Sequence, residues 1–90
     1  EGMPIGQVRL ERAEDEWEIH YALASIARRV GLAKKLLETA IRQFKIDHLG
    51  STVFGRVKLD NLRSQRIFES LRFSRMEGHQ EIIYRQVLSV

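Results

Sequence analysis

The segment WEIHYALASIARRVGLAKKLLETAIRQF, from Trp17 to Phe44, changes its hydrophobic period part-way along. From Trp17 to Leu23 the large apolar side chains occupy every second position, which predicts a β-strand. After Gly31 the apolar residues recur at three- and four-residue intervals, which predicts a helix of about four turns. The inward stripe of this helix consists of Leu32, Ala33, Leu36, Leu37, Ala40, Ile41 and Phe44. A strand that passes directly into a helix is typical of a βαβ unit.

The neighbouring segments extend this unit on both sides. Alternating residues predict a strand from Ile5 to Leu10, and the charged stretch from Glu11 to Glu16 is expected to turn the chain into an antiparallel hairpin. After the helix, Gly50 is a stop signal. A further strand is expected from Val53 to Val57, parallel to the strand that ends at Leu23.

A second helix and a last hairpin complete the pattern. Asp60 or Asn61 is expected to cap this helix. Its inward residues are expected to be Leu62, Ile67, Phe68 and Leu71. The stretch 76–88 turns at Glu77-Gly78-His79 and predicts two more strands. The expected order is β-β-α-β-α-β-β, an α/β (α+β) fold in which two helices pack on a mixed β-sheet.

Composition excludes several classes of site and partner. The 90 residues contain no cysteine, which excludes disulfides, thiol nucleophiles and thiolate metal ligands. The three histidines are scattered, so we expect no metal site. No apolar run approaches the roughly 20 residues that span a bilayer, and a net charge of +3 is far below that of a nucleic-acid-binding tail. We therefore expect one cytoplasmic domain over residues 1–90, with no membrane or nucleic acid as partner.

The junction between the strand that ends at Leu23 and the helix that follows it, residues 25–34, has the features of an anion site. A helix start presents unpaired backbone N–H groups and about half a positive charge. Gly31 lets a phosphate approach the backbone because it has no Cβ, and Arg28, Arg29 and Lys34 add positive charge. The alternative interpretation is a tight-turn glycine beside solvated arginines.

Two motifs in the chain resemble those of the GNAT acetyltransferase family. The family carries Arg/Gln-x-x-Gly-x-Gly/Ala at this junction, and the chain reads RRVGLA from Arg28 to Ala33. The family's Asn-x-x-Ala/Ser-x-x-x-Tyr/Phe-x-x-x-Gly-Phe segment is matched by NLRSQRIFESLRF from Asn61 to Phe73. The stretch from Glu18 to Leu23 also resembles the family's fourth strand. The chain is therefore similar to the carboxy-terminal part of a GNAT domain, and we expect it to be shortened by the first strand, two helices and second strand.

This resemblance implies that the chain binds acetyl-CoA and CoA. It places the cofactor pyrophosphate on the junction residues Arg28, Arg29, Val30, Gly31, Leu32 and Ala33. By the same resemblance, the strand that ends at Leu23 pairs with the pantetheine arm, and Asn61 and Ser64 contact the arm from the other side. Phe68 lies beside the acyl-thioester end. A plain helix cap is an equally good interpretation of Asn61.

The groups that would move protons depart from the family pattern. Family members often use a tyrosine of the second motif as the acid, but Phe68 stands at that position and Arg72 replaces the usual glycine. Glu18 resembles the strand carboxylate that some members use as a general base, and His20 lies on the same strand face. Tyr84 is the candidate replacement acid. Each also has a structural interpretation, with Glu18 and His20 facing solvent and Tyr84 in the core.

We expect an acetyl-CoA-dependent N-acetyltransferase that transfers an acyl group to a primary amine. The run GRVK, from Gly55 to Lys58, is similar to acetyltransferase modules found beside sugar-nucleotide and surface-polysaccharide enzymes. We therefore expect an amino sugar or sugar nucleotide as acceptor, with a protein amino terminus or a small amine as alternatives. The alternative function is a non-catalytic CoA-binding interaction module. We also expect a homodimer, formed through the edge from Ile5 to Leu10 or through an uncovered sheet face.

Overall fold

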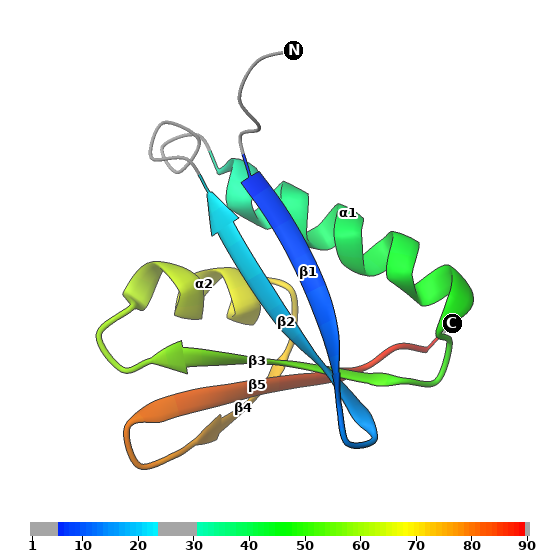
Figure 1. The fold of residues 1–90 in the computed structure, drawn as a ribbon. Coiled ribbons are helices and arrows are strands. Elements are labelled where there is room, and N and C mark those ends of the chain that lie inside the picture. The colour runs from blue at the N-terminus through cyan, green and yellow to red at the C-terminus, as the bar shows by residue number, and fades with distance from the viewer. Residues whose placement is uncertain (1–5, 24–30, 90) are drawn as a thin grey trace.

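The computed structural model describes residues 6–23 and 31–89. Its strands and helices follow the order β-β-α-β-α-β-β, which confirms the predicted fold class (Figure 1). The elements are β1 (Gly6–Ala13), β2 (Glu16–Leu23), α1 (Leu32–Asp47), β3 (Thr52–Lys58), α2 (Leu62–Ser70), β4 (Ser74–Glu77) and β5 (Glu81–Val87). Within these described residues, no helix is both long and apolar enough to cross a membrane.

The strands form one five-stranded mixed sheet in the order β1-β2-β3-β5-β4. β2 runs parallel to β3, and the other neighbours pair antiparallel. β2 pairs with β1 along its whole length, as far as Leu23. Its pairing with β3 is limited to Trp17 with Val53 and Glu18 with Phe54, after which the two strands diverge (Figure 1). We call this divergence between β2 and β3 the split.

Both helices pack on one face of the sheet, and in Figure 1 they lie behind it. The pairing register places Trp17, Ile19 and Tyr21 on this helix face. Glu18 and His20 lie on the opposite face, which we call the open face, as the alternation predicted. No helix among the described residues covers the open face, so side chains there are free to be polar.

The core lies between the sheet and the two helices. Its buried side chains come from both layers and are Ile19, Leu37, Ile41, Val53, Val57, Phe68, Phe73, Ile82, Tyr84 and Leu88. The inward stripe of α1 supplies Leu37 and Ile41, and α2 supplies Phe68. Burial of this apolar surface is the main driving force that holds the helices on the sheet.

Two expectations about the elements were wrong. β1 continues to Ala13, so the turn is confined to Glu14 and Asp15 instead of the whole stretch from Glu11 to Glu16. Charged residues are compatible with this strand because it lies at the sheet edge with one solvated face. Leu62 was expected to face inward, yet it is 56% exposed. It begins α2 and lies at the rim of a cavity, where no core residue covers it.

Candidate functional site

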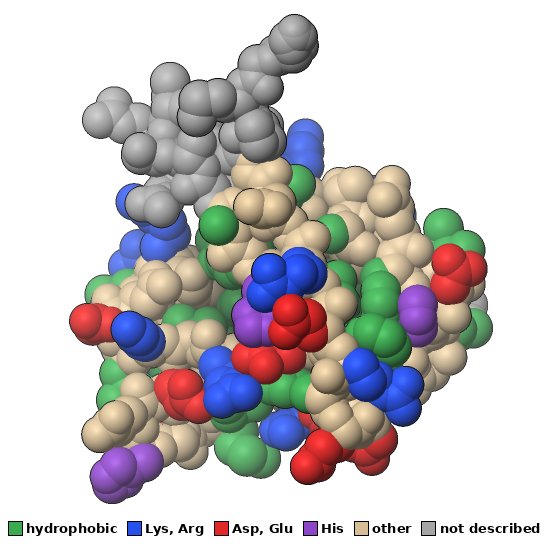
Figure 2. All heavy atoms as spheres, viewed as in Figure 1, with side chains coloured by type: hydrophobic (Ala, Val, Ile, Leu, Met, Phe, Trp, Pro, Cys, Tyr) green, Lys and Arg blue, Asp and Glu red, His purple; other side chains and the backbone are tan. Residues whose placement is uncertain are grey.

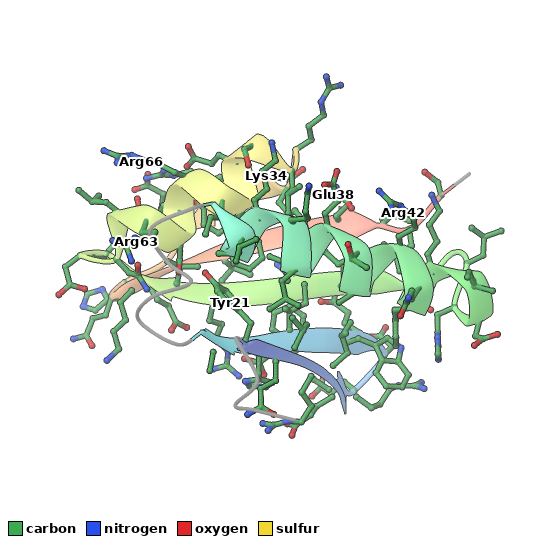
Figure 3. The ribbon with its side chains drawn as sticks, turned by 90° about the horizontal axis from the view of Figure 1, so that it is seen from above. Tyr21, Lys34, Glu38, Arg42, Arg63 and Arg66 are labelled. Carbon is green, nitrogen blue, oxygen red and sulfur yellow. The ribbon has the colours of Figure 1, made fainter. Side chains whose placement is uncertain are left out.

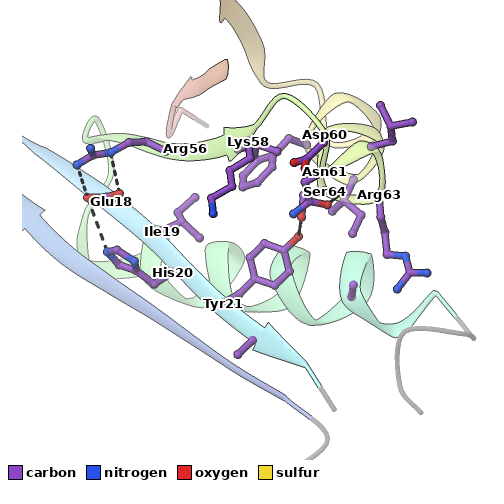
Figure 4. A pocket seen from close by; sticks show the side chains of 16 residues that line it. Glu18, Ile19, His20, Tyr21, Arg56, Lys58, Asp60, Asn61, Arg63 and Ser64 are labelled. Atoms are coloured by element: carbon purple, nitrogen blue, oxygen red, sulfur yellow. Dashed lines mark hydrogen bonds and ion pairs between the residues drawn. The ribbon is translucent and has the colours of Figure 1, made fainter. Parts of the chain in front are cut away.

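The split contains a cavity of about 720 Å³ (Figure 4). Its walls come from β2, β3 and the start of α2, with Ala33 contributing from α1. The part of β2 that lines it is Glu18, Ile19, His20, Tyr21 and Ala22. Side chains of both sheet faces therefore reach the cavity, because no neighbouring strand fills the space beside β2 there. An extended ligand can lie between the two strands.

Hydroxyl groups from β2 and α2 meet across this cavity. The hydroxyl oxygens of Tyr21 and Ser64 form a hydrogen bond of 2.5 Å. Ser64 is held in place by Asn61, the N-cap of α2, whose Oδ1 accepts a hydrogen bond from the Ser64 backbone N–H at 3.1 Å. Phe68 is buried and lines the same cavity. The structure thus brings together the α2 residues that the sequence assigned to the cofactor arm.

On the open face, Arg56 holds Glu18 across the split. The Arg56 Nε donates a hydrogen bond to Glu18 Oε2 at 3.0 Å, and its Nη2 donates to Oε1 at 3.2 Å. This bidentate pair orients the carboxylate at the point where strand pairing ends. The hydrogen bond and the charge of Glu18 raise the pKa of Arg56 above its ordinary value. His20 lies next to Glu18 on the same wall.

The start of α1 carries part of the predicted phosphate site. Gly31 is the N-cap and has φ 69° and ψ 15°, a left-handed conformation that glycine adopts without strain. Apart from its neighbours along the chain, no described residue has an atom within 4 Å of the place where a Cβ on Gly31 would be. Ala33 is buried and lines the cavity, and Leu32 is half-buried. Among the described residues, the space beside the start of α1 is therefore open on the side of Gly31.

Other parts of the predicted cofactor site are only partly described. Arg28, Arg29 and Val30 lie outside the described residues, and their role stays a prediction. Leu23 ends β2, where it pairs with Gly6 of β1. Lys34 extends from α1, and Arg63 and Arg66 extend from α2, all toward the end of the molecule where α1 begins (Figure 3). Of these exposed cations, Arg63 lines the cavity.

Tyr84 lies outside this cavity. Its side chain is fully buried and stacks on Phe68, with 5.3 Å between ring centroids. The Tyr84 hydroxyl donates a hydrogen bond to Glu69 Oε2 at 2.7 Å, and Arg75 donates to the same oxygen at 2.6 Å. Burial, together with the bond to Glu69, raises the pKa of Tyr84 to about 12. The structure does not bring Tyr84 together with Glu18, so this geometry does not support its use as the replacement acid.

The buried Tyr84 hydroxyl should make the protein less stable in alkaline solution. Between pH 10 and about 12 the unfolded chain loses the Tyr84 proton while the folded protein keeps it, so the free energy of unfolding falls as the pH rises. Between about pH 9 and about pH 11 the fall attributable to Tyr84 is about 1–1.5 kcal/mol, which is roughly half of its full size. Urea unfolding at about pH 9 and about pH 11 measures it, and Tyr84→Phe should show a smaller fall than the unaltered chain. Equal falls in the two proteins would contradict this role.

The sequence matches the profile of the acetyltransferase (GNAT) domain over residues 1–74. The chain belongs to the GNAT acetyltransferase family. This membership confirms the family that the two motifs indicated and places the chain among the transferases. No curated protein matches the chain by sequence.

Solved acetyltransferase structures share the fold of this GNAT chain. The ribosomal-protein-S18-alanine N-acetyltransferase from Escherichia coli superposes with a TM-score of 0.77 at 22% identity, over 96% of this chain and 63% of that one. The ribosomal-protein-S5-alanine acetyltransferase from Vibrio fischeri has a TM-score of 0.77 at 16% identity, over 93% of this chain and 54% of that one. A chain of the NatC complex bound to Gag peptide and CoA has a TM-score of 0.71 at 21% identity, over 97% of this chain and 62% of that one. The chain thus spans between 54% and 63% of the length of these proteins.

Several residues that line the cavity in the split were not assigned to the site from the sequence. Among them are Tyr21, Arg56, Lys58, Asp60 and Arg63. Tyr21 contacts Ser64, which is 43 residues away, and Arg56 contacts Glu18, which is 38 residues away. Local patterns do not pair residues at such separations. One signal was present for Arg56, because neighbouring strands bring side chains of the same sheet face together.

Proposed function

We propose that this chain is an acetyl-CoA-dependent N-acetyltransferase and that the split is its cofactor site. The divergence of β2 from β3 is the observation that carries this proposal. β2 pairs with β3 only at Trp17 and Glu18, while its other edge pairs with β1 as far as Leu23. The edge of β2 beside the cavity therefore presents backbone N–H and C=O groups. The pantetheine arm of CoA is extended and carries amides, so it can pair with this edge as an added strand would.

The GNAT family uses acetyl-CoA, and one structural neighbour contains CoA. For this chain we place the pyrophosphate on Arg28, Arg29, Val30, Gly31, Leu32 and Ala33. The space beside Gly31 that no described residue fills supports this placement, because a helix start attracts anions. The exposed cations Lys34, Arg63 and Arg66 at the same end complement the negative charge of the phosphates.

We place the pantetheine arm and the thioester deeper in the split. The arm would run along β2 toward Leu23 and contact Asn61 and Ser64, which line the opposite wall. The thioester would lie beside Phe68, whose buried ring closes the cavity toward the core. An apolar wall there excludes water from the acyl group and so protects the thioester from hydrolysis.

Acyl transfer forms an N–C bond and breaks the C–S bond of the thioester. We propose that Glu18 accepts the proton of the acceptor amine, directly or through water, because its carboxylate lines the cavity where the strands part. Phe68 has no proton to give, and the Tyr84 hydroxyl is bonded to Glu69 outside the cavity. We therefore assign protonation of the leaving thiolate to water. A thiolate whose conjugate thiol has a pKa of roughly 8.5 can leave without the help of a strong acid.

The acceptor is proposed to be a primary amine of an amino sugar or sugar nucleotide. The resemblance of the run from Gly55 to Lys58 to modules of sugar-nucleotide enzymes supports this choice. The names of two structural neighbours supply a specific alternative, because those proteins acetylate alanine of ribosomal proteins S18 and S5. A peptide that begins with alanine therefore belongs in the same test.

Release of free thiol from acetyl-CoA tests the proposed function. We expect release by the 90-residue chain only when a free amine is present, with an amino-sugar nucleotide and an alanine-initiated peptide as acceptors and their N-acetylated forms as matched controls. Calorimetric CoA binding with no release for any amine would favour the alternative, a non-catalytic CoA-binding module. A folded chain that binds no CoA would overturn both functions.

We further propose that the chain forms a homodimer. β1 lies at one edge of the sheet, and an edge strand is a template for pairing with another chain. The open face offers a second surface for a symmetric contact, since no described helix covers it. Light scattering at micromolar concentration should give twice the 10.5 kDa mass of the chain. A monomer under these conditions would contradict the proposal.

A further inference from the structure

Charged side chains on the open face form a row from the split to the edge of the sheet. Figure 2 shows basic, acidic and histidine side chains gathered over the middle of this face. Arg56 of β3 binds Glu18, and Glu18 Oε1 lies 3.7 Å from His20 Nε2 (Figure 4). The same nitrogen lies 3.5 Å from Glu11 Oε1, and Arg9 Nε lies 2.7 Å from Glu11 Oε2. Three neighbouring strands contribute to the row, and Glu11, near its outer end, is a carboxylate exposed to solvent.

The Nε2 atom of His20 is the unusual member of this row. It is buried, and among the described residues it is the one buried side-chain nitrogen or oxygen with no hydrogen-bond partner. A buried polar atom of this kind calls for an explanation, because leaving it unpaired is costly. Glu11 and Glu18 are its nearest charged neighbours, each less than about 1 Å beyond hydrogen-bonding distance. A small rotation of His20 therefore bonds Nε2 to either carboxylate.

The proposed reaction requires a proton to leave the site in every turnover. A primary amine enters as an ammonium ion at neutral pH, because its pKa is roughly 8–10. Formation of the amide removes two protons from the nitrogen, and protonation of the departing thiolate through water accounts for one of them. The second must reach solvent. If it moves to Glu18, the carboxyl has to be deprotonated again, although its side chain is only 15% exposed and both its oxygens face Arg56.

We propose that His20 relays this proton from Glu18 to Glu11. The inference rests on the proposed function. His20 acts on the reaction only through Glu18 and does not touch the acceptor. In its imidazolium form, His20 gives the Nε2 proton to Glu11, which is 53% exposed and passes it to water, and the ring becomes a neutral imidazole that keeps its Nδ1 proton. The bare nitrogen then takes the proton that Glu18 received from the amine. One proton enters the relay and one leaves it, so Glu18 is ready for the next acceptor.

His20→Gln tests the relay, because glutamine keeps a polar side chain of similar size but cannot exchange a proton at neutral pH. We expect kcat to fall about tenfold or more while KM for acetyl-CoA stays within about twofold, since proton movement and cofactor binding involve different groups. Added imidazole should restore most of kcat. His79→Gln is the matched control, because His79 is exposed in the turn between β4 and β5 and does not line the cavity.

Each other result overturns either the relay or the function on which it rests. An unchanged kcat in His20→Gln, or a loss that imidazole does not restore, overturns the relay. Long-range ¹H–¹⁵N NMR gives a readout without turnover, and protons on both ring nitrogens of His20 are expected, because the relay begins from the imidazolium beside two carboxylates. A bare Nε2 in the resting protein overturns the relay. Absence of turnover by the unaltered chain overturns the proposed function itself, and the relay with it.

Discussion

Replacing Gly31 with valine should weaken CoA binding by roughly 30-fold, a loss of about 2 kcal/mol. Gly31 is the N-cap of α1 and has a φ of 69°. A side chain with a Cβ is strained in this left-handed conformation by about 1–2 kcal/mol, so valine should turn the first amides of α1 away from their present direction. Its Cβ would also occupy the open space beside these amides, where we place the phosphates. Calorimetric titration with CoA measures the loss.

Gly50 provides a matched control for this substitution. It also has a positive φ, 92°, and apart from its neighbours along the chain no described residue has an atom within 4 Å of the position of its Cβ. It lies in the turn between α1 and β3 and does not line the cavity. Gly50→Val should therefore strain the backbone without changing CoA affinity. An unchanged affinity in Gly31→Val, or equal losses in the two variants, would contradict the assignment of the phosphates to Gly31.

Replacing Gly55 with alanine should lower the free energy of unfolding by about 1–3 kcal/mol. A Cβ at this position would lie 2.5 Å from Phe68 Cζ and 3.0 Å from its Cε1. The Phe68 ring is held in place because Tyr84 stacks on it and Phe73 packs edge-on at 5.0 Å between centroids. Relief of the overlap must therefore come from a shift of α2 away from β3. In a domain of this size the melting temperature should fall by roughly 4–8 °C per kcal/mol.

A double-mutant cycle identifies the contact that causes this loss. Phe68→Leu removes the ring atoms that the new Cβ would meet, so Gly55→Ala should cost less in that background. We expect a coupling energy of about 1 kcal/mol or more between the two sites. Additive losses would show that the Phe68 ring is not the cause. Since Phe68 lines the cavity, Gly55→Ala should also change CoA affinity.

The expectations that failed concern residues whose surroundings the local pattern does not specify. The charged stretch from Glu11 to Glu16 was interpreted as a turn, although the register with β2 extends β1 to Ala13. Whether a charged residue is part of a strand depends on the partner strand and on which face is solvated. Leu62 has the composition of a core residue, but its position at the start of α2 leaves it at the cavity rim. Burial at helix ends depends on the neighbouring elements.

The amino-acid sequence by itself determined the order of the elements, a cap for α2 at Asp60 or Asn61 and the glycine at the start of α1. These features depend on residues that are close along the chain, so periodicity and short motifs are sufficient to predict them. Asn61 and Ser64, for example, are three residues apart, and their hydrogen bond follows from helix geometry. The family motifs belong to the same class of local signal.

Only the tertiary structure decided which side chains share the cavity and which do not. The parting of β2 and β3 after Glu18 opens the space, and it brings Tyr21 of β2 to Ser64 of α2. The same packing directs Tyr84 to Glu69, away from Glu18, although its position in β5 alone left both outcomes open. The physical reason is that alternation specifies the face on which a side chain lies. Its neighbours on that face depend on strand order, on register and on where the pairing of two strands ends.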